Sequence, residues 1–197
     1  MPYAFQNNED ISSLILQADN IFEVDKDRAY FMLRELSLSL NNRVSSMTHK
    51  SCEIYIPAPE FPCIASKTLD NEGKNYNKII VDNNFKYGNF MRDKWKEKES
   101  FIVLEHDIAP YPEAINNIMW CDHPWCAYEY FHHTGYKLYA MGCVKFSKYL
   151  VENSQEIPKD NNWINTNWNI LDGKVINPLR EKFGRPHLHY PSLAHVK

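Results

Sequence analysis

Two acidic residues directly follow a short apolar stretch in the middle of the chain, and their spacing suits metal chemistry. The stretch covers residues 101–104, and it is followed by Glu105, His106 and Asp107. Four consecutive apolar residues between a charged run and two prolines predict a strand buried on both faces. In a strand, residues two apart point to the same side, so Glu105 and Asp107 would face together. Oxygen ligands at the carboxyl edge of an α/β sheet suit a divalent cation, although the strand could also simply emerge into solvent there.

Three histidines near the C-terminus are further candidate ligands. His187, His189 and His195 lie in a short segment with Pro186 and Pro191, which stiffen it. A frayed terminus has no need of so many imidazoles. One interpretation is a metal-dependent hydrolase, in which these three histidines join Glu105 and Asp107 around zinc.

Asp172 is the candidate for acid or base chemistry. Apolar spacing predicts a helix that opens at Trp168 and is stopped by Gly184, and we expect Asp172 in its first turn. The helix dipole stabilises a carboxylate there by a few tenths to about 1 kcal/mol. Asp172 is therefore either a catalytic carboxylate or an ordinary acid at a helix start.

A cysteine-rich segment offers a weaker metal signal. Cys121 and Cys126 flank His123, which is one possible zinc site. The four-residue gap and the lack of a matching second pair favour loop packing instead.

Length and composition fit one well-cored domain. The chain has 197 residues, a formal net charge of −3 and a pI near 6.2, with the charges interspersed. No basic face therefore predicts binding to nucleic acid or to a membrane surface, and no apolar run is long enough for a membrane span. Five cysteines, an odd number, and the absence of a secretory pattern at the start indicate reduced thiols and a cytoplasmic location.

The predicted elements alternate in a way that positions these residues on one sheet. A strand, a helix and a strand in succession imply a right-handed parallel crossover and an open α/β sheet. We expect residues 1–50 to form a helical extension. The expected helices cover residues 10–22, 25–43, 88–98, 112–119, 147–153 and 168–183, the strands cover residues 53–56, 78–81, 101–104 and part of 138–146, and residues 158–169 form a mobile loop.

This order resembles the nucleotide-sugar glycosyltransferases of the GT-A fold. Glu105-His106-Asp107 looks like a counterpart of their Asp-x-Asp signature, and residues 88–93 look like the helix that precedes it. Trp168 and Asp172 are similar to the aromatic and acidic pair that faces the acceptor. The resemblance implies an α/β fold over residues 51–197, a single GT-A-like domain with an open mixed sheet flanked by helices.

The resemblance also implies a set of roles. The expected reaction moves a sugar from a nucleotide-diphosphate donor to a hydroxyl acceptor and depends on Mn²⁺ or Mg²⁺. The metal ligands would be Glu105, Asp107 and His195, the base Asp172, the nucleotide contacts Pro57, Ala58, Pro59, Glu60, Arg92 and Asp93, and the acceptor contacts Trp120, Trp125, Tyr128 and Trp168. The aromatic residues have core packing as their alternative role. A sugar- or nucleotide-binding domain without catalysis is the remaining alternative.

Overall fold

The computed structural model describes residues 52–83, 85–131, 137–139 and 141–196. The predicted helices over residues 10–22 and 25–43 lie outside these ranges. The described elements, in chain order, are β1 (Glu53–Ala58), α3 (Ile64–Asn71), β2 (Asn77–Ile80), α4 (Lys86–Glu97), β3 (Phe101–Leu104), β4 (Ile108–Ala109), α5 (Ala114–Met119), β5 (Trp125–Phe131), β6 (Lys137–Leu138), β7 (Cys143–Phe146), α6 (Lys148–Glu152), α7 (Ile157–Asp160), η1 (Trp163–Asn165), α8 (Trp168–Phe183) and β8 (His187–His195).

The strands form one mixed sheet in the order β2-β1-β3-β7-β5-β8-β4, with β6 beside β5. β1 pairs in parallel with β2 and β3, as the strand–helix–strand order predicted. β7 runs antiparallel between β3 and β5, and β8 runs parallel to β5. The carboxyl ends of β1, β2, β3, β5 and β8 therefore meet at one edge of the sheet. The predicted open mixed sheet flanked by helices is confirmed.

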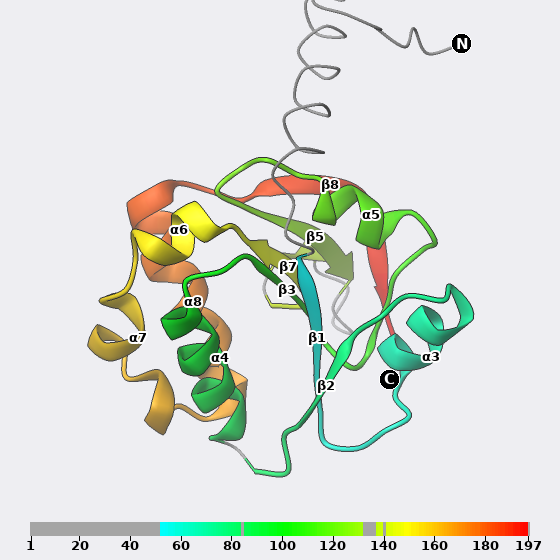
Figure 1. Cartoon of the computed structure of the whole chain (residues 1–197), viewed down its shortest axis with the longest axis horizontal. Coiled ribbons are helices and arrows are strands. Elements are labelled where there is room, and N and C mark those ends of the chain that lie inside the picture. Colours follow the sequence, from blue (N-terminus) through cyan, green and yellow to red (C-terminus); the bar gives the residue numbers. More distant parts are fainter. Residues whose placement is uncertain (1–51, 84, 132–136, 140, 197) are drawn as a thin grey trace, which may run out of the picture. The chain divides into compact units, whose positions relative to one another are not determined.

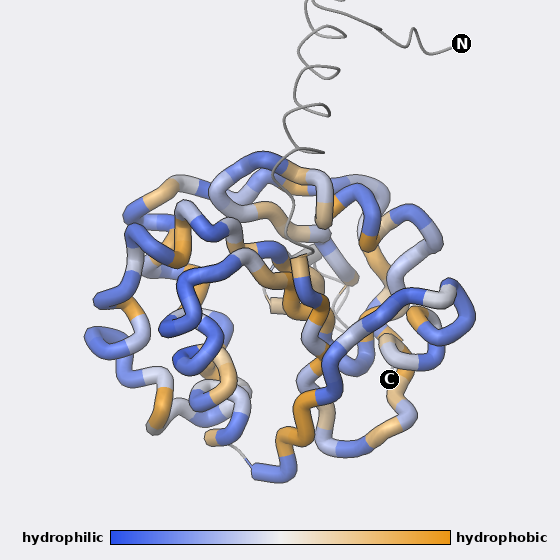
Figure 2. Tube along the Cα trace, viewed as in Figure 1, coloured by the Kyte–Doolittle hydropathy of each residue, from blue (hydrophilic) through white to orange (hydrophobic). Residues whose placement is uncertain are grey.

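Helices cover both faces of the sheet, and the alternation of strand side chains divides the core in two (Figure 1). α4, α6, α7 and α8 pack against one face, where Phe101 and Val103 of β3 point. α3 and α5 pack against the other, where Ile102 and Leu104 point. β3 is thus buried on both faces, as its sequence predicted. Hydrophobic residues follow the central strands in Figure 2.

Four segments differ from the sequence-based predictions. α3 was not predicted, and the aromatic segment after α5 contains the buried strand β5 rather than a packed loop. The predicted mobile loop over residues 158–169 holds part of α7 and the helix η1, which Trp163, fully buried, fixes to the core. The histidine-rich tail is the nine-residue strand β8, which pairs with β5 and β4. None of the helices in the described part of the chain is long and apolar enough to cross a membrane.

Gly88 permits the close packing of α4 against η1, and we expect Gly88→Ala to destabilise the protein. A Cβ atom there would lie 2.0 Å from the backbone oxygen of Trp163, so backbone must move. The expected loss is about 3 kcal/mol of unfolding free energy, measured by urea denaturation. Gly173 is the matched control within α8, because its added Cβ would meet only Asn177 at 3.7 Å. Gly173→Ala should stabilise the protein by up to about 1 kcal/mol, and equal effects of the two changes would contradict this account.

Candidate functional site

The predicted chemical residues meet at the carboxyl edge of the sheet. Glu105 and Asp107 follow β3, and His195 ends β8, which runs in the same direction. α8 returns the chain to the start of β8, so its N-terminal half, with Asp172, lies at the same edge. We call Glu105, Asp107, Asp172 and His195 the acidic site.

Glu105 is held where the sheet ends. Its backbone N–H donates to the carbonyl of Gly142 at 2.8 Å, and its side chain accepts from the hydroxyl of Tyr87 at 3.3 Å. Tyr87 lies in the first turn of α4, just before the predicted start of this helix, which is why it was missed. β3 ends at Leu104, and the chain turns before β4, so the argument that Glu105 and Asp107 share one side of a strand was wrong. The turn, not the pleat, brings the two acids together.

Asp107 and His195 form a direct pair. The distance between Asp107 Oδ2 and His195 Nε2 is 2.8 Å, and both side chains are largely buried. The backbone reinforces this arrangement, because Val196 donates to the carbonyl of Asp107 at 2.8 Å and β4 pairs with the end of β8. The sequence expectation that His195 reaches the acidic residues is met in position. In this structure its Nε2 atom contacts Asp107 rather than standing free as a ligand.

Asp172 differs from an ordinary acid at a helix start. It is the fifth residue of α8, and the first turn contains no acidic residue, so the predicted first-turn position was wrong. Its Oδ1 atom is buried and has no hydrogen-bond partner among the described residues. Burial, opposed by a hydrogen bond from the Met141 backbone and reinforced by the charge of Asp107, raises the pKa of Asp172 to about 6. A carboxyl group that titrates near neutral pH is suited to proton transfer.

The three carboxyl groups oppose one another electrostatically. Burial, and then the charges of Asp172 and Asp107, hold the pKa of Glu105 well above its ordinary value. The pKa of the Tyr130 hydroxyl is also raised, by burial and then by the three carboxylates. A divalent cation would relieve this repulsion, and an oxygen-rich donor set fits Mn²⁺ or Mg²⁺. The chemistry of the donor set thus suits the expected metal, but among the described residues no three ligand atoms of the acidic site lie within 4.8 Å of one another.

The predicted acceptor aromatics separate into two groups. Trp168 begins α8 beside the acidic site, with its ring 5.0 Å from that of Tyr87 and 5.5 Å from that of His106. Trp125 and Tyr128 are buried in the core on β5, with 1% and 0% exposure, so their prediction as acceptor contacts was wrong. Trp120 is exposed, but it precedes β5 and lies toward the opposite edge of the sheet.

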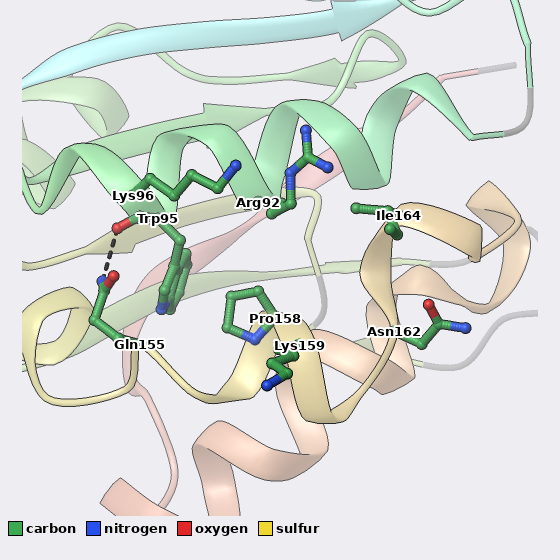
Figure 3. Close-up of a pocket in the computed structure, with 8 residues that line it drawn as sticks. All are labelled: Arg92, Trp95, Lys96, Gln155, Pro158, Lys159, Asn162 and Ile164. Atoms are coloured by element: carbon green, nitrogen blue, oxygen red, sulfur yellow. Dashed lines mark hydrogen bonds between the residues drawn. The ribbon is translucent and has the colours of Figure 1, made fainter.

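The predicted nucleotide contacts also separate. Pro57 and Ala58 end β1 at the same edge as the acidic site, and the exposed Pro59 and Glu60 follow them. Arg92 instead lines a pocket of about 280 Å³ between α4, α7 and η1, and the acidic site contributes none of its lining (Figure 3). Arg92 forms an ion pair with Asp93, and Lys96 shares the same carboxylate. In this structure Arg92 and Asp93 therefore contact each other on α4.

The ligand set of the zinc hydrolase hypothesis is not assembled. His187 and His189 lie at the start of β8, beside Cys126 and Tyr128 of β5, whereas His195 ends the strand. Leu193 pairs with Tyr130 after an irregularity in the register. Measured along β5, His189 and His195 are therefore separated by about four residues, on the order of 13 Å. The three histidines therefore cannot bind one ion together with Glu105 and Asp107.

Comparison with known proteins gives one structural likeness. No protein-family model and no curated protein sequence matches the chain. Among solved structures, a glycosyltransferase involved in the glycosylation of the major capsid of PBCV-1 matches with a TM-score of 0.42 and 16% identity, covering 71% of this chain and 82% of that one. A likeness of this size leaves the function to be argued from the acidic site.

Proposed function

We propose that this protein is a metal-dependent glycosyltransferase that moves a sugar from a nucleotide-diphosphate donor to a hydroxyl acceptor. The observation that carries the proposal is the convergence of Glu105, Asp107 and Asp172 at the carboxyl edge of the sheet, where α/β proteins bind ligands. The motif order that resembles GT-A enzymes supports the same assignment.

Glu105 and Asp107 would hold the cation, with His195 beside them. Bound Mn²⁺ or Mg²⁺ would neutralise charge on the departing diphosphate. Such cations usually keep waters and phosphate oxygens as ligands, so two carboxylates suffice. Tyr87 donates to Glu105, and His195 is paired with Asp107, so both carboxylates are oriented before any ligand arrives.

Asp172 would take the proton of the acceptor hydroxyl. Its buried Oδ1 has no partner among the described residues, and its pKa of about 6 leaves it ionised at neutral pH. Trp168, one turn earlier on α8, supplies an aromatic face for an acceptor sugar. The end of β1, with Pro59 and Glu60, is the proposed position of the nucleotide base.

A nucleoside diphosphate should raise the melting temperature only when Mn²⁺ or Mg²⁺ is present, because Glu105 and Asp107 would hold the cation that neutralises its phosphates. The stabilisation should reach about 2.7 kcal/mol at a hundredfold excess over Kd. The measurement is a thermal-shift series over several nucleoside diphosphates and nucleotide sugars. Each ligand is compared with its own ligand-free sample in Mn²⁺ and in EDTA, so that any effect of EDTA on the protein itself cancels. Equal stabilisation in both buffers would contradict metal dependence, and turnover of a nucleotide sugar would separate an enzyme from a binding domain.

A further inference from the structure

A second group of metal-binding side chains lies at the opposite edge of the sheet from the acidic site. Side-chain ligand atoms of Cys121, Cys126 and His189 lie within 4.8 Å of one another, and so do those of Cys121, His123 and His187. Cys121 belongs to both groups. The five residues come from the turn after α5, from β5 and from the start of β8 (Figure 1).

The strand pairing explains this assembly. β5 and β8 run in parallel, with Cys126 opposite His187 and Tyr128 opposite His189. His187 and His189 are two residues apart, which brings both imidazoles to one side of β8. Their rings are 4.9 Å apart, and the ring of His187 stacks on that of His123 at 4.1 Å.

One ligand spacing, that between Cys121 and His123, matches tetrahedral zinc. Bond lengths of about 2.3 Å to sulfur and about 2.0–2.1 Å to nitrogen place neighbouring ligands about 3.6 Å apart for sulfur and nitrogen. The distance between Cys121 Sγ and His123 Nδ1 is 3.6 Å. Cys126 is fully buried and Cys121 is 8% exposed, so two sulfur atoms lie in a space that solvent scarcely reaches.

Hydrogen bonds hold the group together. The side chains of Cys126 and His189 and the backbone of His123 are hydrogen-bonded to Cys121. A buried thiolate is the form that binds zinc. The nearby ammonium of Lys145 is already engaged by the carbonyls of Met119 and Cys121, at 2.6 and 2.5 Å.

We propose that Cys121, Cys126 and His189 bind a structural zinc ion, and that His123 or His187, whose ligand atoms lie near Cys121 but outside that three-residue group, moves to supply the fourth ligand. Zinc binding would release the thiol protons of Cys121 and Cys126 to solvent and leave two thiolates and two neutral imidazoles around the ion. The site fastens the start of β8 to β5 and to the turn after α5. Because β8 ends at His195, the same strand also presents an imidazole to the acidic site.

The test uses the full chain, purified without a histidine tag, with its metal content measured by mass spectrometry. We expect about one zinc per chain in the native protein and in Cys63→Ser, since Cys63 belongs to neither ligand group. Cys121→Ser and Cys126→Ser should bind zinc at least about 100-fold more weakly. Replacing zinc by Co²⁺ should produce the absorption band of cobalt–thiolate bonding in the native protein and in Cys63→Ser, but not in Cys121→Ser or Cys126→Ser.

Protection of the native thiols keeps the proposal testable if the variants fail to fold. Zinc should slow alkylation of Cys121 and Cys126 by N-ethylmaleimide at least about tenfold, with no protection of Cys63, as mapped by peptide mass spectrometry. A native protein without zinc, without a cobalt–thiolate band and without protection would overturn the proposal, as would a disulfide between Cys121 and Cys126. Neither result would bear on metal binding by Glu105 and Asp107.

Discussion

Asp172→Asn is expected to lower the kcat of sugar transfer by about 10²–10⁴-fold while leaving donor affinity almost unchanged. The change keeps the size of the side chain but removes the buried basic oxygen, which in the proposed mechanism would act only once the acceptor hydroxyl loses its proton. The measurement is steady-state transfer together with direct binding of the nucleoside diphosphate. Glu181→Gln, an exposed change near the end of the same helix, is the control and should retain full activity. An Asp172→Asn enzyme with full activity would leave proton transfer to another group, such as Glu129, or indicate a retaining mechanism.

The same substitution carries a stability signature with a defined sign. The pKa of Asp172 is about 6 in the fold and 3.8 when unperturbed, so the folded state holds this proton more tightly than the unfolded chain. Its contribution to stability is therefore full below about pH 4 and is lost as the pH rises to about 6. Without divalent metal, Asp172→Asn should be more stable than the native protein at pH 7 by about 1–3 kcal/mol, measured by urea denaturation. A loss of stability at pH 7 would show that the ionised carboxylate supports the fold.

Asp107→Asn should damage both donor binding and turnover, because the metal that it is proposed to hold would be needed in the ground state as well as in the transition state. We expect metal-dependent stabilisation by nucleoside diphosphate to disappear and kcat/KM to fall by about 10³-fold or more. Asp160→Asn, an exposed acid of α7, is the control. Wild-type Mn²⁺-dependent binding in Asp107→Asn would place the metal elsewhere. The two variants together distinguish a ligand from a base, since only Asp107→Asn should weaken donor binding.

Removing the C-terminal histidine segment is not a usable test of His195. Truncation before His187 would leave the sheet folded only if this segment were a tail outside the sheet. In the structure this segment is β8, which lies between β5 and β4 inside the sheet. Deleting it would expose the inner strand β5, so single substitutions are the informative changes.

Local sequence determined the elements with strong patterns. The four consecutive apolar residues of β3 are removed from water only if the strand is buried on both faces. The acidic residues that follow mark where the strand leaves the core. The spacing of Val175, Ile176 and Leu179 likewise predicted α8, which carries Asp172. These patterns depend on side chains within one turn or one strand, so a single segment suffices to reveal them.

The tertiary structure alone decided which of these residues meet. β8 has no clean alternation and contains Pro191, so its sequence gave no strand signal, yet its parallel pairing with β5 brings His195 to Asp107 and His189 to Cys126. The pKa of Asp172 also depends on groups distant in the chain, since the charge of Asp107 raises it and a hydrogen bond from the Met141 backbone lowers it. Parallel strands need long connections, so the partners of such a site are separated by scores of residues, and no local pattern records their contact.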